Sequence, residues 1–486
     1  MAVLKSINPT NGKILGEVKI VNKAKVEEAA ETAREAIDDW KEVPLKKRGK
    51  MMLKLAGLLE QKADYLGRKI SLEMGKPLSE SRGEVEGSVE NVKYLAKEAM
   101  RVLRDEVLKP KLTQKQIKKI DKLASEDILD YLRKTDAKDI SVMRYDAVGV
   151  VAVIKPWNYP ISTALMSIVP ALIAGNVVIF KPSEETPLIS NELAKLIWQA
   201  GVPKNVFQIL QGRGQVGSML VDSEIDMVSF TGSSEVGKVI AEKCSQRLIK
   251  YCLELGGSSA AIVLRDADLE LATDKIIQGR FGNCGQICSA IKRVIVEELV
   301  ADKLIELLIE KVNEIQVGDP LDKKTNMGPL VSQKQLKKLQ DQVTRGVIQG
   351  GRIVAGGRKL YEEPYNNGWF HEATLMIHLQ PRTEIMQEEV FGPILTLCRA
   401  ENMEQAIEYA NQTEYGLTAA VFTSSKRKAD KVIRKVEVGT TTVNTDMVYF
   451  AEAPWSGLKE SGFGVGMSKH GIWEFVHKKH VYIDRS

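Results

Sequence analysis

The first hundred residues carry apolar side chains at a spacing of three or four positions, which is the period of an α-helix. This pattern predicts amphipathic helices over 23–41, 45–70 and 84–109. From residue 111 to residue 140 the chain becomes highly charged and keeps only a thin apolar stripe. Such a stretch is more typical of a solvated helix than of a partner-binding element. Because it lies between two better-patterned regions, we expect it to be an appendage and not part of a core.

The hydrophobic pattern changes at residue 147 to short β-branched runs that alternate with helical segments. Four of these runs predict strands, at 147–154, 176–181, 205–210 and 226–232. The same rhythm returns after residue 260, with runs such as AAIVL, RVIVE and ILTLCRA. This alternation predicts doubly wound parallel sheets that are covered by helices on both faces. A chain of 486 residues is too long for one hydrophobic core, so we expect an α/β protein with two such domains.

Composition and charge narrow the class of protein further. The net charge of +5 comes from lysines that are mixed with acids along most of the chain, so we expect neither a nucleic acid nor a membrane as a partner. The N-terminus lacks the apolar core of a secretory signal, and the longest apolar run, 161–175, contains Pro170 and is too short to span a bilayer. Five scattered cysteines make no disulfide framework. These features predict a cytoplasmic protein in a reducing compartment.

Two glycine-containing loops are candidates for phosphate binding. Residues 211–218, QGRGQVGS, follow a predicted strand and precede a helix, as a dinucleotide fingerprint should. The acidic residue expected about twenty positions later is missing, which weakens this interpretation. Residues 230–237, FTGSSEVG, compete with it, because Ser233 or Ser234 can cap the next helix and the open amides of a helix start suit a phosphate. An ordinary capped helix would show the same pattern.

The segment FGNCGQICSA, residues 281–290, places Cys284 and Cys288 four positions apart. A metal site is disfavoured, because zinc needs three or four nitrogen or sulfur ligands and the five histidines lie elsewhere in the sequence. Free cysteines are often buried and inert, so packing is the simplest interpretation. The neighbouring glycines make a poor helix interior and indicate a close approach of the backbone, as a substrate pocket requires. One cysteine can therefore pack while the other points into a pocket.

Six motifs together make the sequence resemble the aldehyde dehydrogenase superfamily. They are PWNYP (156–160), KPSE (181–184), FTGSSEVG (230–237), ELGG (254–257), NCGQICSA (283–290) and EEVFGP (388–393), and they occur in the order and spacing of that superfamily. The resemblance runs from INPTNG near the start of the chain to APWSGLKESGFG (453–464) near its end. Six ordered motifs are far more specific than any one of them.

The resemblance implies a role for the residue at each matching position. Cys288 corresponds to the nucleophile, Glu254 to the general base and Asn158 to the amide that stabilises the oxyanion, while Cys284 becomes a packing residue. It also implies binding of NAD, with NADP as a possible second cofactor, and it moves the pyrophosphate from the Gly212 fingerprint to the FTGS helix. The matching cofactor-binding residues are Trp157, Lys181, Glu184, Ser233, Glu389 and Phe391.

The implied reaction explains why these residue types are needed. A cysteine thiolate attacks the aldehyde carbonyl, and donors such as the Asn158 amide and the Cys288 backbone N–H stabilise the resulting oxyanion. Hydride then passes to the cofactor and leaves a thioester, which water hydrolyses with Glu254 as the base. The product is a carboxylic acid.

The resemblance also implies a division of the chain. Residues 1–110 with 147–255 correspond to a dinucleotide-binding domain and 256–450 to a catalytic domain. Residues 111–146 with 466–486 correspond to an arm that crosses to a partner subunit, so a homodimer or homotetramer is expected. Some positions depart from the usual motifs: Ser258 follows ELGG where lysine is frequent, Ser456 replaces a glycine, and Val465 stands where arginine is common.

Two other functions remain open at this point. In a CoA-acylating relative, CoA would take the acyl group in place of water, but such enzymes commonly lack the ELGG glutamate that is present here as Glu254. A non-catalytic dinucleotide-binding protein on the same fold would not need Cys288, Glu254 and Asn158 together. The aldehyde itself stays undefined, because semialdehydes, aliphatic aldehydes and amino-aldehydes all fit the motifs.

Overall fold

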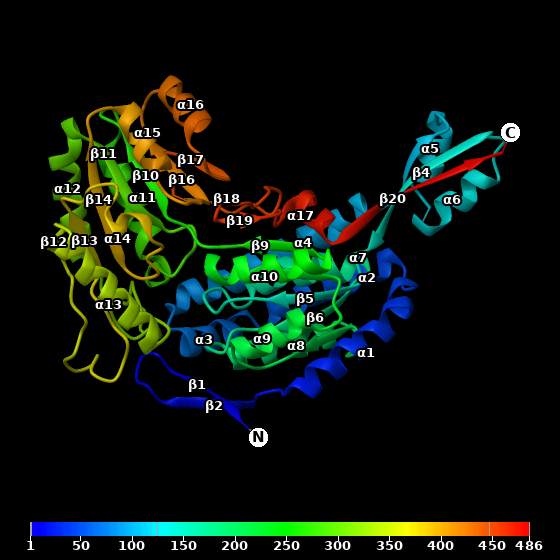
Figure 1. Cartoon of the computed structure of the whole chain (residues 1–486), viewed down its shortest axis with the longest axis horizontal. Coiled ribbons are helices and arrows are strands. Elements are labelled where there is room, and N and C mark those ends of the chain that lie inside the picture. Colours follow the sequence, from blue (N-terminus) through cyan, green and yellow to red (C-terminus); the bar gives the residue numbers. More distant parts are fainter. Residues whose placement is uncertain (1, 124, 447, 486) are drawn as a thin grey trace.

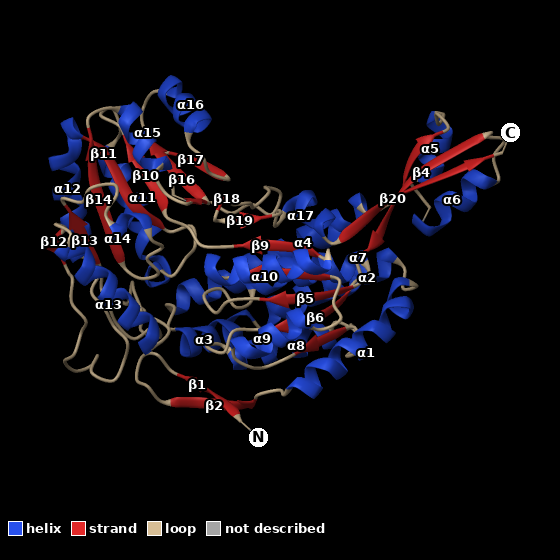
Figure 2. Ribbon diagram, in the orientation of Figure 1, coloured by secondary structure: helices blue, strands red, loops and turns tan. Residues whose placement is uncertain are grey.

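The computed structural model describes residues 2–123, 125–446 and 448–485. Figures 1 and 2 show two α/β bodies that stand side by side and a slender arm that projects from one of them. Each α/β body is built on a largely parallel sheet with helices on both faces, which confirms the predicted fold class. Within the described residues no helix is long and apolar enough to cross a membrane.

The first body is built on a six-stranded sheet of order β19-β9-β8-β5-β6-β7, in which only β19 runs antiparallel. Strands β5 and β6 are buried along their whole length, as strands covered on both faces must be. The strands of this sheet are β5 (Val150–Ile154), β6 (Val177–Lys181), β7 (Phe207–Ile209), β8 (Met227–Thr231), β9 (Lys250–Glu254) and β19 (Gly462–Phe463). Its helices are α1 (Lys23–Lys41), α2 (Leu45–Gln61), α3 (Ala63–Met74), α4 (Leu78–Val102), α7 (Ser162–Ala174), α8 (Pro187–Gln199), α9 (Gly214–Asp222), α10 (Ser234–Arg247) and α17 (Ser468–Glu474).

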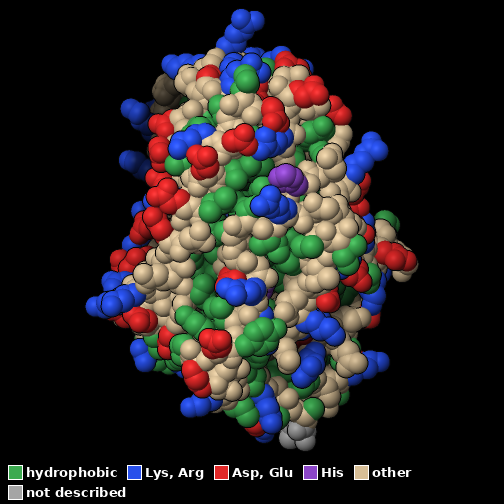
Figure 3. Space-filling view, turned by 90° about the vertical axis from the view of Figure 1, so that its left-hand side faces the viewer, with side chains coloured by type: hydrophobic (Ala, Val, Ile, Leu, Met, Phe, Trp, Pro, Cys, Tyr) green, Lys and Arg blue, Asp and Glu red, His purple; other side chains and the backbone are tan. Residues whose placement is uncertain are grey.

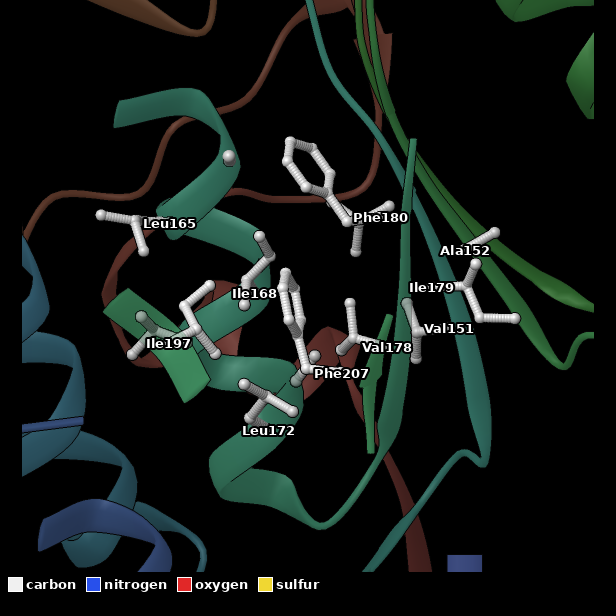
Figure 4. Packing of buried hydrophobic residues seen from close by; sticks show 14 of the residues in the cluster. Val151, Ala152, Leu165, Ile168, Leu172, Val178, Ile179, Phe180, Ile197 and Phe207 are labelled. Carbon is white, nitrogen blue, oxygen red and sulfur yellow. The ribbon is translucent and has the colours of Figure 1, made fainter. Parts of the chain in front are cut away.

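The core of this body lies between the sheet and the helices that cover it. Figure 4 shows Ile168 and Leu172 of α7 facing Val178 and Phe180 of β6, with Phe207 of β7 packed between them. The rings of Phe180 and Phe207 lie 6.3 Å apart. This packing fixes the carboxyl ends of β5, β6 and β8, where the candidate site residues follow in the chain.

The second body is built on a seven-stranded sheet of order β12-β13-β14-β11-β10-β16-β17. Figure 3 shows that acidic and basic side chains are interspersed with apolar ones on its outer face. Its strands are β10 (Ser259–Val263), β11 (Ile291–Glu297), β12 (Arg352–Ala355), β13 (Thr374–Ile377), β14 (Ile394–Ala400), β16 (Thr418–Phe422) and β17 (Thr440–Val443). Its helices are α11 (Leu269–Phe281), α12 (Glu298–Asn313), α13 (Gln333–Ile348), α14 (Glu384–Gln387), α15 (Met403–Asn411) and α16 (Lys426–Lys435).

The arm is a three-stranded antiparallel sheet of order β20-β4-β3 with two short helices. Strand β20 (Val476–Asp484) pairs with all nine residues of β4 (Asp139–Ala147), although the two are more than 300 residues apart in sequence. The other arm elements are β3 (Glu106–Lys109), α5 (Gln114–Ile120) and α6 (Ser125–Arg133). Two further antiparallel pairs, outside the arm, are β1 (Val3–Ile7) with β2 (Ile14–Lys19) and β15 (Tyr415–Gly416) with β18 (Leu458–Lys459).

Two of the predicted helices differ from the structure. The helix predicted over 84–109 starts earlier, at Leu78, and ends at Val102, because residues 106–109 pair with β4 as a strand. The helix predicted over 45–70 is two helices, α2 and α3, which meet at Lys62 and both pack on α4. A local apolar period cannot reveal such a break, because the period continues on both sides of it.

The charged stretch 111–140 is also more structured than a single solvated helix. It holds α5 and α6 and the first residues of β4, with residue 124 outside the described part. Its thin apolar stripe contributes Ile120, Ile128, Leu132 and Ile140 to a small separate core, which Val142 of β4 completes. The appendage is therefore an independently packed layer of helices on a sheet.

Candidate active site

A tight loop after α11 presents the two cysteines of the FGNCGQICSA segment. Helix α11 ends at Phe281 and a single 3₁₀ turn covers Gly282–Gly285. Asn283 and Cys284 both adopt left-handed backbone conformations, with φ of +50° and +55°; asparagine tolerates this conformation better than most residues, but it is costly for Cys284. Gly285 is also left-handed, and a side chain there would collide with the Gly392 carbonyl of the EEVFGP segment. The loop is thus pressed against a neighbouring segment.

The turn separates the two cysteines by environment. Cys284 is 1% exposed and belongs to the core of the seven-stranded body. Cys288 is half-buried and lines a cavity of about 480 Å³ between the two bodies. All five cysteines of the chain carry free thiols. The structure thus places one sulfur in packing and the other at a pocket wall.

Asn158 meets the cysteine loop from the end of β5. Its side-chain amide donates a 2.9 Å hydrogen bond to the backbone carbonyl of Gln286, and the backbone carbonyl of Asn158 accepts a 3.2 Å bond from the side-chain amide of Asn283. Both residues are buried, and Asn158 lines the same cavity as Cys288. An amide carries two N–H groups, so one remains to serve an oxygen in the cavity.

Glu254 closes the other side of the cavity, at the end of β9. It is 9% exposed, and neither carboxylate oxygen has a hydrogen-bond partner of good geometry within the described residues, although the Gly466 amide lies close enough to lower its pKa. Burial raises the pKa of Glu254, and the nearby ammonium of Lys155 opposes this shift. A buried, unpartnered carboxylate with a raised pKa is suited to accept a proton near neutral pH.

The Cys288 thiol is held in its neutral form by this arrangement. Burial, together with the carboxylates of Glu389 and Glu254, raises the pKa of Cys288 to about 12. A thiol in such surroundings becomes a thiolate only when a nearby base takes its proton or when negative charge is removed. The carboxylates of Glu254 and Glu389 line the same cavity as this thiol.

The residues matched to cofactor binding form two groups. Lys181 ends β6 as a buried side chain, with its ammonium 3.5 Å from a carboxylate oxygen of the more exposed Glu184. Ser233 follows β8 and caps α10 by accepting a hydrogen bond from the amide of Val236. These three residues lie at the carboxyl ends of β6 and β8, the parallel strands on either side of β5, and α/β folds bind ligands at this edge of the sheet. Among the described residues that line the 480 Å³ cavity, Ser233 is present but Lys181 and Glu184 are not.

The second group lies close to Cys288. Trp157 and Phe391 stand edge to face, with ring centres 5.5 Å apart, and Glu389 accepts a 3.1 Å hydrogen bond from the amide of Gly257. Trp157 comes from the six-stranded body, whereas Glu389 and Phe391 precede β14 of the other sheet. All three line the cavity. The two sheets therefore supply facing walls of one site.

The glycine fingerprint at 211–218 has a structural role in this geometry. Gly214 begins α9, and Gly217 packs over the aliphatic part of the Lys181 side chain. Two positions that depart from the usual motifs have defined surroundings. Ser258 is buried and accepts a hydrogen bond from Lys292, and Val465 lines the cavity.

Some cavity residues were missed by the sequence analysis. Lys155 directly precedes the PWNYP motif, is buried and donates to Ser229 and Thr231. Tyr449 and Trp455, with ring centres 5.0 Å apart, and Tyr159 form an aromatic wall. Lys155 stands beside a motif, and Tyr159 and Trp455 stand inside quoted motifs, so their positions were usable signals, whereas Tyr449 comes from a segment without a motif.

Comparison with known proteins defines the family. The aldehyde dehydrogenase family model matches residues 2–481. The chain is 36% identical over 480 residues to betaine aldehyde dehydrogenase of Bacillus subtilis, covering 98% of this chain and 93% of that protein. It is 33% identical to human retinaldehyde dehydrogenase 3, covering 98% and 88% of the two chains. A crystal structure of Staphylococcus aureus betaine aldehyde dehydrogenase in complex with NAD⁺ superposes with a TM-score of 0.91 at 32% identity, covering 99% and 92%.

The fold and the thiol site thus define an α/β oxidoreductase with a cysteine between two sheets. The chain belongs to the aldehyde dehydrogenase family, as the six motifs predicted. It is an NAD(P)-dependent enzyme that oxidises an aldehyde to a carboxylic acid.

Proposed function

We propose that Cys288, Asn158 and Glu254 carry out the oxidation, with NAD⁺ as the electron acceptor. One observation carries this proposal: a half-buried thiol, an amide with a spare N–H and an unpartnered buried carboxylate share one cavity. A structural role alone would not require these three groups to converge. The five free thiols support the further proposal that the enzyme works in a reducing, cytoplasmic compartment.

The residues around the cavity fit a dinucleotide. Glu184 and Lys181 can hydrogen-bond the hydroxyls of the adenosine ribose, and the open amides at the start of α10 beside Ser233 suit the pyrophosphate. Glu389, Phe391 and Trp157 would hold the nicotinamide end beside Cys288. The oxidised nicotinamide ring supplies the acceptor for the hydride that leaves the substrate. We assign residues 1–110 with 147–255 to dinucleotide binding and 256–450 to the catalytic domain.

The chain's own residues account for the remaining steps. The Cys288 thiol loses its proton to water in the cavity, and its sulfur forms a bond to the aldehyde carbon. The carbonyl oxygen becomes an oxyanion, which the free N–H of Asn158 and the Cys288 amide stabilise; one such donor lowers the barrier by about 3 kcal/mol. Loss of hydride leaves a thioester on Cys288. Glu254 then deprotonates the attacking water, the C–S bond breaks and the acid is released.

The substrate end of the cavity favours an uncharged, bulky aldehyde. Its wall is formed by the rings of Tyr159, Tyr449 and Trp455 and by the side chain of Met166. Helix α4 contributes Gly83 and Gly87, and at both positions an added Cβ would have no atom within 4 Å. An apolar wall beside open space suits an apolar tail better than a carboxylate, whose desolvation would be costly. We therefore propose aldehydes with bulky apolar groups over semialdehydes of small acids.

We also propose that the arm joins copies of this chain into a dimer or tetramer. Strand β20 is exposed along most of its length and leaves one edge unpaired, with Tyr482 53% exposed. The arm stands away from both α/β bodies (Figure 1). A nine-residue open edge is a template for strand addition by a second chain. Light scattering at micromolar concentration should give at least twice the 54.0 kDa mass of the chain, and a 54.0 kDa particle would refute this proposal.

An aldehyde panel tests the proposed substrate class. The purified enzyme is given NAD⁺ and a series of aldehydes that runs from small semialdehydes to bulky aromatic ones, and kcat/KM is measured for each. We expect acid formation with the highest kcat/KM for bulky apolar members. Acyl transfer to CoA at a rate above hydrolysis would instead favour the CoA-acylating alternative.

A further inference from the structure

The cysteine loop is held in a strained conformation by a residue from a distant helix. Asn283 and Cys284 are successive left-handed residues, and such a conformation persists only where the surroundings enforce it. The backbone N–H of Asn283 donates a 2.8 Å hydrogen bond to a carboxylate oxygen of Glu80, which is 203 residues away in the sequence. Glu80 lies in the first turn of α4. No motif in the chain pointed to this residue.

A second carboxylate on the same helix face holds the other side of the site. Glu84, one turn after Glu80, accepts hydrogen bonds from the backbone amides of Ile161 and Ser162 at 3.0 and 3.2 Å. These amides begin α7, which has no side-chain cap of its own. Glu84 therefore anchors the segment that directly follows Asn158 and Tyr159.

Lys76 links the two carboxylates. Its side chain is fully buried, its ammonium lies 2.6 Å from a carboxylate oxygen of Glu84, and the same ammonium sits 3.5 Å from the ring centre of Tyr159. Burial raises the pKa of Glu80, and the positive charge of Lys76 opposes this shift. Lys76 thus favours the ionised form of Glu80, which is the stronger acceptor for the Asn283 amide.

We propose that Glu80 is a positioning residue for the reaction: it holds the Asn283–Cys284 turn so that Cys288 keeps its orientation toward Asn158. Lys76 and Glu84 support this role by fixing the start of α7 to the same part of helix α4. This inference rests on the proposed role of Cys288. Because reacting groups must stay close to their productive geometry, release of the turn should slow the attack on the aldehyde without weakening cofactor binding.

The test compares three substitutions in helix α4. Glu80→Ala removes the acceptor, Glu80→Gln keeps an oxygen that accepts from the Asn283 amide, and Glu86→Ala removes an exposed carboxylate from the same helix as a control. Rapid mixing with NAD⁺ and aldehyde measures the first-turnover burst of NADH, and mass spectrometry follows hydrogen exchange of the peptide containing residues 281–288. Melting temperature and KM for NAD⁺ are measured in parallel.

We expect Glu80→Ala to slow the burst about tenfold or more and to speed exchange in the 281–288 peptide, with KM for NAD⁺ within about twofold of wild type. Glu80→Gln and Glu86→Ala should stay within about threefold of wild type in both measurements. If Glu80→Ala yields no folded protein, Glu80→Leu, which keeps the volume but cannot accept, takes its place and should show the same losses.

Two outcomes would overturn the inference. One is a wild-type burst and wild-type exchange in Glu80→Ala, and the other is a Glu80→Gln variant as slow as Glu80→Ala. Failure of the underlying function would look different, since Cys288→Ser would then retain its burst whatever the behaviour of the Glu80 variants.

Discussion

The side-chain amide of Asn158 donates a 2.9 Å hydrogen bond to the carbonyl of Gln286, two residues before Cys288. This bond joins the end of a strand in the six-stranded body to the cysteine loop of the seven-stranded body. It fixes the plane of the amide and leaves its second N–H for a substrate oxygen. The proposed donor and the proposed nucleophile are therefore positioned relative to each other before any substrate enters, and such an arrangement would stabilise an oxyanion without reorganisation.

The different surroundings of the two cysteines lead to the first prediction. Cys288→Ser should lower kcat by at least about a thousandfold, because a hydroxyl is a far weaker nucleophile than a thiolate. Cys284→Ser places a hydroxyl in a buried core and should cost about 1–3 kcal/mol of stability while leaving most activity. Steady-state turnover and thermal melting check both variants. A dead Cys284→Ser enzyme beside an active Cys288→Ser enzyme would reverse the assignment.

Glu254 should control the second half of the reaction. Glu254→Gln is expected to slow thioester hydrolysis more than hydride transfer, so rapid mixing should show a burst of NADH followed by very slow turnover. Only the ionised carboxylate accepts a proton, and its folded-state pKa is raised. The wild-type rate should therefore rise with pH through a midpoint above that of an ordinary glutamate, and the variant should lack this rise. Wild-type steady-state rates in Glu254→Gln would rule out the role.

The strands and the broad architecture could be predicted from the sequence for a simple physical reason. Strands such as β6 and β8 are buried on both faces, so they read as short continuous apolar runs within 176–181 and 226–232. Whether such a run forms a strand depends mainly on residues that are adjacent in the sequence. The division of a helical region into α2 and α3 depends instead on packing against α4, which a local hydrophobic pattern does not reveal.

The candidate site divides in the same way. Cys288, Glu254 and Asn158 could be predicted because each lies in a sequence motif. The residues of such a motif have a fixed spacing because a single loop holds several of them together. Glu80 and Tyr449 were not found, because each reaches the site from a segment without a motif, and their contacts span 203 and 160 residues of sequence. Long-range contacts of this kind become visible only in the folded chain.

The open wall of the cavity predicts a change in substrate range. Gly87 of α4 lines the cavity with free space beside it, so Gly87→Leu should fit sterically and fill part of the substrate end. We expect kcat/KM for bulky aldehydes to fall about tenfold or more, while that for a small aliphatic aldehyde stays within about threefold. Gly57→Leu on α2, where an added Cβ also has no atom within 4 Å, is the matched control outside the cavity and should change neither value. Equal losses for both aldehydes would contradict the assignment of this wall.

Leu248 offers a test of backbone strain. It follows α10 in a left-handed conformation with φ of +55° and is 93% exposed, so its side chain gains little from burial. Leu248→Gly should raise the free energy of unfolding by about 0.5–1 kcal/mol, because glycine adopts this conformation without steric cost. Leu299→Gly, at another exposed leucine but inside α12, should lower it by a similar amount. Chemical denaturation compares the two, and destabilisation by both would mean that Leu248 is covered in the assembled protein.

Cofactor choice should depend on Glu184. Its carboxylate can accept hydrogen bonds from the ribose hydroxyls of NAD⁺, whereas the 2′-phosphate of NADP⁺ would face a like charge. The expected penalty is about 1–3 kcal/mol, or roughly ten- to a hundredfold in affinity, partly offset by Lys181 at 3.5 Å. The wild-type enzyme should therefore prefer NAD⁺. Glu184→Gln should narrow the NAD⁺-to-NADP⁺ ratio of kcat/KM by improving NADP⁺.

The control for this prediction is Glu192→Gln on α8, which removes a carboxylate that pairs with Lys195 and leaves Lys181 with its partner. Both substitutions remove one negative charge, so any effect of the protein's net charge on binding of the dianionic phosphate of NADP⁺ appears in both variants. Only Glu184→Gln also removes the local repulsion between this carboxylate and the phosphate. A wild-type enzyme that already favours NADP⁺, or an equal ratio in Glu184→Gln and Glu192→Gln, would show that Glu184 does not set the choice.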